Sequence, residues 1–506
     1  MSQLQEEYIK RILSARVYDV SKETRLHEAP QLSRRLNNTV WLKREDEQQI
    51  FSFKCRGAFN RIFKLMQQGT VPGVIAASAG NHAQGVALAA NRLGIPSVIV
   101  MPQTTPGIKV EAVRALGGEA ILHGDDFDAA LAHALKLGEE RGFPFIHPFD
   151  DPDTIAGQGT VGVELCRQHP GALDVVFLPV GGGGLAAGVS VYMKYLRPDV
   201  RIVGVEPVDA ASMHGALAAD KRVILPQVGL FADGVAVKQV GRYSFDVCRE
   251  YLDEVILVTV DEMSNAIKDI FSETRTLTEP AGALAVAGMK RYVKERGVSG
   301  QIFIAINSGA NINFDRLRHV AERVEIGESR EALLAVTIPE KPGSFLQFCN
   351  IIGRRGITEF NYRYADHASA NVFAGVELRG GAEERKALVG ELEAGGYTVL
   401  DMTHNDTAKL HLRHMIGGHA AMESERLYRF VFPERPGALL DFLKAMGERW
   451  NITLFHYRNH GAAYSRVLVG MSVPAEEQAE LDSVIATLGF KSEDESDNAA
   501  YQMFMR

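Results

Sequence analysis

The chain has 506 residues, of which 46% are hydrophobic and 23% charged, and its formal net charge at pH 7 is −8. A chain of this length is expected to form two to four domains, and the composition is that of an ordinary globular protein. The sequence has no basic cluster and no apolar run of membrane-spanning length. These features argue against nucleic acid and a membrane as partners.

The N-terminal sequence and the cysteines indicate the cellular compartment. The first seven residues, Met-Ser-Gln-Leu-Gln-Glu-Glu, are polar and acidic, unlike a signal or transit peptide. The four cysteines have no paired spacing, which argues against a disulfide framework and against a zinc site. They are Cys55, Cys166, Cys248 and Cys349. We therefore expect a protein of the reducing cytoplasm.

Residues 5–320 alternate short apolar runs, which predict strands, with amphipathic stretches, which predict helices. The predicted strands are Val74–Ala77, Ser97–Met101, Ala120–Leu122, Val175–Val180, Arg201–Val205 and Ile302–Ile306. The predicted helices include Gln84–Arg92 and Lys109–Leu116. Apolar strands that alternate with helices indicate an α/β fold with an open, mostly parallel sheet.

The C-terminal part of the chain contains an internal repeat. Ile338–Phe348 is echoed by Phe432–Phe442, and Glu359–Tyr364 is echoed by Leu454–Asn459. Each copy predicts a strand, a Pro-Gly turn, a helix, two strands and a second helix, which is a small α+β unit. One interpretation is that the two copies only hold subunits together, because such modules serve many roles.

These patterns divide the chain into four segments. Residues 1–322 form the predicted catalytic domain, and residues 323–330 form a charged linker that contains a glycine. The first α+β repeat covers residues 331–415, and the second covers residues 422–506.

The first candidate for chemistry is Lys54, in the stretch Phe51-Ser-Phe-Lys-Cys-Arg-Gly-Ala58 that follows the charged run Lys43–Asp46. We expect the flanking aromatic residues to exclude water, which reduces the preference of a lysine for its charged form. Such a lysine can act as a nucleophile. Taken alone, Lys54 is more simply explained as a solvated surface residue.

The second candidate is the stretch Ser78-Ala-Gly-Asn-His-Ala-Gln-Gly85, which lies between a predicted strand and a predicted helix. Open α/β sheets bind ligands at such positions, and the amides of a helix N-terminus suit a carboxylate. The candidate carboxylate-binding residues are Ser78, Ala79, Gly80, Asn81 and His82. An ordinary helix cap would explain the serine and the glycine but not the Asn-His pair.

The third candidate is the glycine run within Pro179–Leu185, again between a strand and a helix. Consecutive glycines allow the backbone to close around a phosphate at the start of a helix. The fourth candidate is Ser308, in Asn307-Ser-Gly-Ala-Asn311 directly after a predicted strand. A hydroxyl there can donate to a pyridine nitrogen, although Ser-Gly is also common in plain turns.

The glycine run also fits a rival function. Gly182-x-Gly184-x-x-Ala187 matches the loose dinucleotide fingerprint, and Glu206 follows at the end of the next strand, where a ribose-binding acid would lie. On this stretch alone the chain would be a dehydrogenase. That interpretation gives Lys54 and the loop 78–85 no role.

Together and in this order, the four stretches resemble the pyridoxal-phosphate lyases of the tryptophan-synthase-β type, which have fold type II, and most closely the biosynthetic threonine dehydratases. The resemblance implies a catalytic domain with two subdomains, followed by two ACT-like regulatory repeats. It implies that Lys54 carries pyridoxal 5'-phosphate, that Asn81 bonds its ring oxygen and that Ser308 faces its ring nitrogen. The phosphate is implied to bind at Gly181, Gly182, Gly183, Gly184 and Leu185.

The activity implied by the resemblance is the conversion of L-threonine to 2-oxobutanoate and ammonia, the first step of isoleucine biosynthesis. Lys54 is implied to remove the α-proton, and serine is expected to be a secondary substrate that yields pyruvate. The family implies a homotetramer. Related metal-binding members carry a carboxylate where this chain has Ser212, so the resemblance implies no divalent metal.

The repeats are expected to bind the effectors, with isoleucine as inhibitor and valine opposing it. Each copy offers a strand-to-helix turn whose free amides can bind an amino-acid carboxylate, beside apolar residues that can receive a branched side chain. The candidate effector residues are Pro342, Gly343, Pro436, Gly437 and Leu440.

Overall fold

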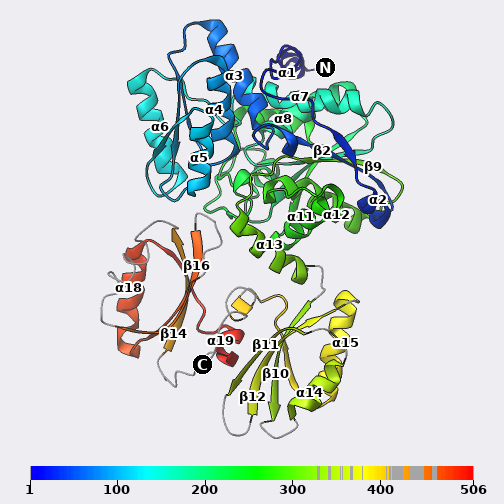
Figure 1. Cartoon of the computed structure of the whole chain (residues 1–506), viewed down its shortest axis with the longest axis vertical. Helices are drawn as coiled ribbons and strands as arrows, with labels where there is room; N and C mark the ends of the chain where they lie inside the picture. The colour runs from blue at the N-terminus through cyan, green and yellow to red at the C-terminus, as the bar shows by residue number, and fades with distance from the viewer. Residues whose placement is uncertain are drawn as a thin grey trace. The chain divides into compact units, whose positions relative to one another are not determined.

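The computed structural model of the chain describes residues 2–327, 331–339, 344–353, 355, 357–364, 369–378, 380–405, 407–408, 412, 425–433, 450–457 and 464–504. The chain folds into two compact units, Met1–Leu317 and Arg318–Arg506 (Figure 1). Within the described residues, no helix is both long enough and apolar enough to cross a membrane.

The first unit contains a six-stranded sheet with the strand order β1-β2-β9-β6-β7-β8. The edge strand β1 (Leu26–Glu28) is antiparallel to β2, and the remaining pairs are parallel. The parallel strands are β2 (Thr39–Arg44), β9 (Ile302–Asn307), β6 (Val175–Pro179), β7 (Arg201–Pro207) and β8 (Glu254–Val258). The mostly parallel sheet predicted from the apolar runs is therefore confirmed.

A second, three-stranded parallel sheet forms the smaller subdomain of this unit, in the order β3-β4-β5. Its strands are β3 (Val74–Ala77), β4 (Ser97–Met101) and β5 (Glu119–Leu122). The unit also contains α1 (Gln3–Leu13), α2 (Pro30–Leu36), η1 (Glu45–Glu47), α3 (Lys54–Gln68), α4 (Asn81–Leu93), α5 (Gly107–Ala115), α6 (Phe127–Arg141), α7 (Pro152–Gln168), α8 (Gly184–Leu196), α9 (Ser212–Ala218), η2 (Asp233–Val235), α10 (Arg242–Tyr251), α11 (Val260–Thr274) and α12 (Pro280–Arg296).

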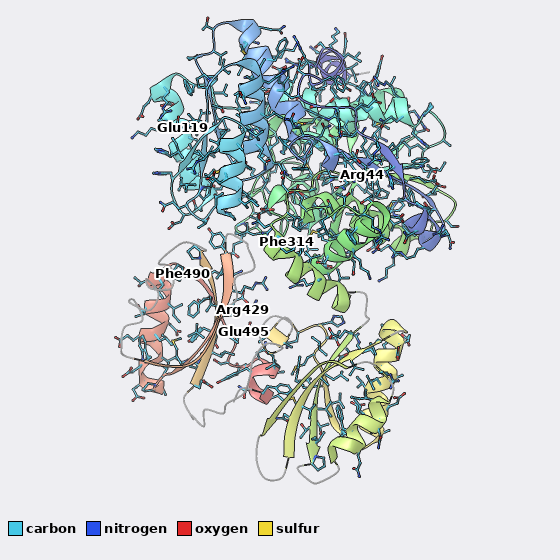
Figure 2. All side chains as sticks on the ribbon, viewed as in Figure 1. Arg44, Glu119, Phe314, Arg429, Phe490 and Glu495 are labelled. Carbon is cyan, nitrogen blue, oxygen red and sulfur yellow. The ribbon has the colours of Figure 1, made fainter. Side chains whose placement is uncertain are left out.

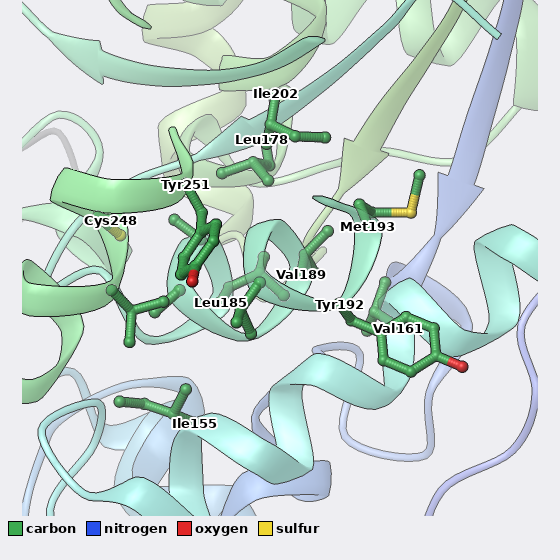
Figure 3. Close-up of a cluster of buried hydrophobic side chains, with 14 of the residues drawn as sticks. Ile155, Val161, Leu178, Leu185, Val189, Tyr192, Met193, Ile202, Cys248 and Tyr251 are labelled. Carbon is green, nitrogen blue, oxygen red and sulfur yellow. The ribbon is translucent and has the colours of Figure 1, made fainter. Parts of the chain in front are cut away.

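The core of the larger subdomain is organised around α8, a helix that is buried on nearly every side (Figure 3). The helices α7 and α8 lie close together, and two helices can do so only where the side chains between them are small. A Cβ atom at Gly188 on α8 would lie 2.4 Å from the carbonyl oxygen of Ile155 on α7. The apolar side chains in this cluster include Ile155, Val161, Leu178, Leu185, Val189, Tyr192, Met193, Ile202 and Tyr251.

The charged run Lys43–Asp46 is buried, contrary to the usual behaviour of such runs. It forms the end of β2 and the start of η1. Lys43 pairs with Glu164 on α7 at 2.5 Å, and Glu45 pairs with Arg56 on α3 at 2.8 Å; all four side chains are fully buried. This cluster fixes the start of α3 against β2 and α7.

The second unit contains two four-stranded antiparallel sheets, one for each repeat. The first has the order β11-β12-β10-β13 and the second the order β15-β16-β14-β17. The elements of the first repeat are β10 (Glu331–Pro339), α14 (Ser344–Ile352), β11 (Ile357–Tyr364), β12 (Ser369–Glu377), α15 (Gly381–Ala394) and β13 (Thr398–Asp401). Those described in the second are β14 (Glu425–Pro433), β15 (Asn451–Tyr457), β16 (Tyr464–Ser472), η4 (Ala475–Glu477), α18 (Gln478–Leu488), β17 (Lys491–Asp494) and α19 (Ala499–Phe504).

The two repeats share details of backbone structure. β11 shifts register against β12 between Ile357 and Glu359, and β15 shifts against β16 between Ile452 and Leu454, at equivalent places. Each repeat ends its sheet with a short fourth strand, β13 or β17, that the sequence pattern did not predict. The helix α13 (Phe314–Gly327) runs through the first five positions of the predicted linker, 323–327.

The repeats pack against each other through α19. The Phe504 ring lies 5.8 Å from the Phe373 ring of the first repeat, and Asn371 donates to the Met503 carbonyl oxygen at 2.7 Å. Within the second repeat, Arg429 donates to Glu495 at 2.8 Å across the sheet edge (Figure 2). The C-terminal helix thus joins the two copies within this unit.

Candidate active site

The pairing of β2 with β9 brings Lys54 and Ser308 together. These parallel neighbours end side by side, at Arg44 and Asn307. The loops that follow them are joined by an isolated bridge between Ser52 and Gly309, and Ala310 donates to the Phe51 carbonyl oxygen at 2.9 Å. This places the N-terminus of α3 at the carboxyl edge of the sheet, where open α/β sheets bind ligands.

Lys54 is the first residue of α3, and it is half-buried. Its Nζ donates to the Pro148 carbonyl oxygen at 3.1 Å and lies 5.2 Å from the centroid of the Phe53 ring. Burial lowers the pKa of Lys54 to about 8, while Glu279 acts in the opposite direction. Only one flanking aromatic excludes water, because Phe51 has a positive φ of 55° and its side chain is 55% exposed.

The glycine run forms a tight turn between β6 and α8. A Cβ atom at Gly182 would lie 2.2 Å from the Phe149 ring, and one at Gly181 would lie 2.8 Å from the Val235 Cα. Gly183 has a φ of 93°, which disfavours other residues. Among the described residues, the amide N–H groups of Gly181, Gly182 and Gly183 have no acceptor. These amides and the N-terminus of α8 form a site for an anion.

Asn81, at the start of α4, is held in one orientation by two partners. Its Nδ2 donates to Glu279 Oε1 at 2.6 Å, and its Oδ1 accepts from Asn311 Nδ2 at 2.5 Å. Glu279 is 4% exposed. Burial, and then the charge of Asp233, raise the pKa of Glu279 to about 7 against the hydrogen bond from Asn81.

Ser308 is buried, and its Oγ lies 3.5 Å from the Ala281 carbonyl oxygen, the outer limit of a hydrogen bond. The hydroxyl therefore retains the capacity to bond a ligand.

One pocket contains Lys54, Asn81, the glycine run and Ser308. It is lined by Phe53, Lys54, Asn81, Phe149, Pro179, Gly181, Gly182, Gly183, Gly184, Leu185, Gly234, Val235, Glu279, Ala281 and Ser308. Ser78, Ala79, Gly80 and His82 do not line this pocket. Four separate stretches of sequence thus meet in one cavity, as their shared chemistry predicts.

The His82 side chain has a structural contact instead of facing the pocket. Its Nε2 donates to the Ile146 carbonyl oxygen at 2.7 Å, and burial lowers the pKa of the imidazole to about 3. A neutral, buried imidazole cannot pair with a substrate carboxylate through charge. Ser78 accepts from the Gly80 amide at 3.2 Å, as an ordinary turn residue does.

Glu206, the acid of the dinucleotide fingerprint, is a helix cap. Its carboxylate accepts from the amides of Met213 and His214, each at 2.8 Å, at the N-terminus of α9. Burial raises the pKa of Glu206 to about 7. Ser212 donates to the same carboxylate at 3.4 Å. No group of three metal-ligating side chains occurs in the described part of the chain.

Sequence reasoning missed several pocket residues: Phe149, Gly234, Val235, Glu279 and Ala281. For Glu279, the sequence offered one signal, the Glu-Pro pair at 279–280. An acidic residue before a proline often marks the start of a helix. Phe149 and Val235 lie in connecting segments whose local sequence carries no pattern, and only the fold brings them to the glycine turn.

Comparisons with known proteins identify the chemistry of this pocket. Residues 17–309 match the family described as pyridoxal-phosphate dependent enzyme. Residues 322–412 and 417–505 match the C-terminal regulatory domain of threonine dehydratase. The chain is a member of the biosynthetic threonine dehydratase family of pyridoxal-phosphate-dependent enzymes.

Relatives in this family match nearly the whole chain. The biosynthetic L-threonine dehydratase of Burkholderia multivorans is 53% identical over 503 residues, which is 99% of each chain. That of Escherichia coli is 50% identical over 500 residues, or 99% of this chain and 97% of the relative. The mitochondrial threonine dehydratase of Saccharomyces cerevisiae is 46% identical over 514 residues, or 99% of this chain and 89% of the relative.

Solved structures agree with the fold of the first unit. The processed form of threonine deaminase isoform 2 from Solanum lycopersicum is 48% identical, with a TM-score of 0.63 over 64% of this chain and 90% of that chain. Maize serine racemase is 32% identical, with a TM-score of 0.57 over 63% of this chain and 95% of that chain. Fold type II and its two subdomains are thereby confirmed.

The pocket fits pyridoxal phosphate. The unpaired amides of the glycine turn can donate hydrogen bonds to a phosphate, and the amine of Lys54 can react with the aldehyde carbon of the cofactor. Asn81 has one amide N–H left for the ring oxygen, and the Ser308 hydroxyl is available for the ring nitrogen. The enzyme is a lyase that depends on this cofactor, and the dehydrogenase alternative is discarded.

Proposed function

We propose that the protein converts L-threonine to 2-oxobutanoate and ammonia, with serine as a secondary substrate that gives pyruvate and ammonia. The β-hydroxyl is lost as water, and a water molecule is taken up again when the resulting enamine is hydrolysed. The observation that carries this proposal is the convergence of Lys54, Asn81, the glycine turn and Ser308 in one pocket. The relatives named as threonine dehydratases, which align over nearly the whole chain, support the choice of substrate.

The glycine turn and α8 hold the cofactor at its phosphate end, because their free amides and helix dipole favour an anion. When bound, pyridoxal phosphate supplies an electron-withdrawing ring conjugated with the substrate α-carbon. Ser308 places a neutral hydroxyl against the ring nitrogen, and a hydroxyl does not hold that nitrogen protonated as a carboxylate would. Asn81 positions the ring through its oxygen, and Glu279 and Asn311 hold the Asn81 amide.

Lys54 is the base in this scheme. A lysine whose pKa lies near 8 is unprotonated in an appreciable fraction of molecules at neutral pH. Its Nζ takes the proton from the α-carbon of threonine, the β-hydroxyl leaves as water, and the remaining enamine is hydrolysed to the keto acid and ammonia. Phe53 limits the access of water to Nζ.

The substrate carboxylate is proposed to bind the backbone amides of the loop Ser78–Asn81, which lies at the start of α4. The side chain of His82 takes no part, as its hydrogen bond to Ile146 indicates. One methyl group distinguishes threonine from serine, which is worth about 1–3 kcal/mol, so serine turnover should be weaker but measurable.

The two repeats are proposed to sense isoleucine as an inhibitor and valine as its antagonist, in a homotetramer of the cytoplasm. The match of residues 322–412 and 417–505 to a regulatory domain supports a role in sensing effectors over a role that only holds subunits together. The candidate turns at Pro342, Gly343, Pro436, Gly437 and Leu440 lie outside the described residues. They stay predictions, as do the effectors and the oligomeric state.

The catalytic proposal is tested with the variant Lys54→Ala in the full chain. We expect the visible absorbance of the bound cofactor to disappear and threonine turnover to fall by at least three orders of magnitude, the scale of losing a base and nucleophile. Secondary structure, followed by circular dichroism, should be unchanged. Turnover near that of the native chain would remove Lys54 from the mechanism.

The regulatory proposal is tested by adding isoleucine and valine to the full chain and to a chain that ends after Gly327. The full chain should lose activity with isoleucine and regain it with valine, through a coupling of about 1–3 kcal/mol. The activity of the shortened chain should change with neither isoleucine nor valine. If it stays active and is still inhibited, the effector site lies in the catalytic unit.

A further inference from the structure

A charged triad lies beside the pocket, on three elements that are distant in sequence. Asp233 in η2 pairs with Lys109 on α5 at 2.8 Å and with Arg316 on α13 at 3.3 Å. Arg316 also donates to the carbonyl oxygens of Leu230 at 3.1 Å and of Phe231 at 3.2 Å. The guanidinium fork thus holds both the backbone and the side chain of segment 230–233.

The segment that this triad holds continues directly into the pocket wall. Gly234 and Val235 follow Asp233 and line the pocket. Val235 packs so closely on Gly181 that a Cβ atom there would lie 2.8 Å from the Val235 Cα. A Cβ atom at Gly234 would lie 3.1 Å from Ala281, another lining residue. Any displacement of η2 therefore moves the wall against which the glycine turn is packed.

The triad also acts on the pocket through charge. The carboxylate of Glu279 is ionised less readily because of Asp233 and more readily because of Lys109 and Arg316. Lys54 on α3 is the other charged group that faces Glu279, and Asn81 on α4 is its hydrogen-bonding partner. Burial opposes the ionisation of Asp233, but Lys109 and Arg316 outweigh it and keep the pKa of Asp233 below its usual range.

We propose that Asp233, held between Lys109 and Arg316, is a positioning residue: it fixes Gly234 and Val235 against the glycine turn and tunes the charge of Glu279, which orients the Asn81 amide. The proposal rests on the proposed function for its kinetic test only, because the packing contacts concern cofactor affinity. Asp233 does not line the pocket itself, and it acts through Gly234 and Val235, which do.

Arg316 lies in the first turn of α13, and it joins this turn to the pocket wall within the first unit.

A nearby ion pair provides a matched control. Lys238 on the segment after η2 pairs with Asp128 on α6 at 2.7 Å, and it too joins the larger subdomain to the smaller one. Both side chains are about half exposed, and Lys238 is not among the charges that act on Glu279. Lys238→Met therefore removes an inter-subdomain ion pair without removing the proposed positioning contact.

Two quantities separate the geometric role from the electrostatic one. The first is the dissociation constant of pyridoxal phosphate from the apoprotein, measured by absorbance titration. The second is the midpoint of the acidic limb of kcat/KM for threonine, which reports the ionisation of Lys54, the proposed base, together with that of its neighbour Glu279. Both are measured in the full chain for Asp233→Asn, Arg316→Met, Arg316→Lys, Lys109→Met and the control Lys238→Met.

Arg316→Lys and Arg316→Met should both raise the dissociation constant about tenfold, since neither preserves the fork that holds segment 230–233. Arg316→Met and Lys109→Met should move the acidic limb upward by about half a pH unit, because Glu279 loses a cation. Asp233→Asn should move the midpoint of the acidic limb to lower pH, and Arg316→Lys should leave this midpoint unchanged.

The proposal is overturned if Asp233→Asn and Arg316→Met move the limb in the same direction, or if Lys238→Met matches the triad variants in both quantities. Unchanged cofactor affinity in every triad variant would also overturn it. If the native chain binds pyridoxal phosphate but does not convert threonine, the proposed reaction fails, while the dissociation constants still decide the positioning role.

Discussion

Two cationic residues lie two positions apart on α3, the half-buried Lys54 and the fully buried Arg56, and their surroundings differ. Lys54 faces the pocket, donates to one carbonyl oxygen and forms no ion pair with any described residue. Arg56 points to the opposite side and donates to Glu45, Glu164, Thr160 and the Lys22 carbonyl oxygen. Its guanidinium has an acceptor for each of its N–H groups.

The difference shows how burial leads to reactivity in one case and to rigidity in the other. Burial without a close counter-ion lowers the pKa of Lys54 to about 8 and leaves a usable base. At Arg56 burial also opposes the charge, but Glu45 and Glu164 outweigh it and raise the pKa. The ion cluster around Arg56 holds α3 in place, and Lys54 at the start of the helix is the proposed base.

The largest effect on stability is expected for Arg56→Met. Removing Arg56 from the buried ion cluster leaves the Glu45 carboxylate without its ion-pair partner and leaves Glu164 paired with Lys43 alone, which costs about 3–5 kcal/mol. We expect this loss in urea unfolding of the full chain, followed by the fluorescence of Trp41 in a Trp450→Phe background.

The control for this prediction is Arg61→Met on the same helix. Arg61 pairs with Asp151 at 3.0 Å and with Asp153 at 3.2 Å, and its side chain is 23% exposed. Its loss should cost no more than about 1 kcal/mol. Equal losses for Arg56→Met and Arg61→Met would contradict the distinction between a saturated buried cluster and a peripheral pair.

A smaller effect of opposite sign is expected for Lys54→Met in the apoprotein. The folded chain holds the Lys54 ammonium at a cost, because its pKa of about 8 lies below the value near 10.4 of an unfolded chain. At pH 7 the variant should therefore be more stable than the native apoprotein by about 3 kcal/mol, since each pKa unit corresponds to about 1.4 kcal/mol.

The pH dependence of that difference is the sharper test. The cost of the buried ammonium is fully present below pH 8 and disappears as the pH rises to about 10.4, where both states release the proton. The native apoprotein should thus gain stability over this range, and Lys54→Met should not. A stability difference that is independent of pH between 7 and 10.5 would show that packing, and not charge, distinguishes the variants.

The smallest effect concerns Ser308→Asp. A carboxylate in place of the buried hydroxyl would hold the ring nitrogen of the cofactor protonated and stabilise the carbanionic state, which slows loss of the β-hydroxyl. We expect kcat for threonine to fall about tenfold and a side reaction of transamination to appear, detected as loss of the visible cofactor band during turnover. Ser308→Ala provides the control without a charge. If kcat is unchanged and transamination does not appear, Ser308 only positions the ring.

The sequence alone predicted the elements whose hydrophobic pattern is local, and the candidate residues that directly follow them. The strands Ser97–Met101 and Val175–Pro179 were predictable because fully buried parallel strands are continuous apolar runs. The glycine turn and Ser308 follow such strands directly, so their place at the sheet edge was predictable too.

Partners that are far apart in sequence could not be predicted in the same way. The strand β2 carries Lys43 and Arg44, which are buried only because Glu164 and Asp46 pair with them. Glu279 reaches Asn81 across 198 positions of sequence. Such contacts depend on the completed fold, and neither propensity nor spacing encodes them.

The central claim is that Lys54, and no other buried lysine, carries the cofactor. Borohydride reduction of the purified holoprotein fixes pyridoxal phosphate covalently to its lysine, and peptide mass spectrometry then locates the label. Lys43 is the internal control, since it is fully buried but donates to Glu164, Gln168 and the Thr24 carbonyl oxygen. The account predicts one label, on the peptide that contains Lys54; a label on Lys43 or on any other lysine, or no label, would contradict it.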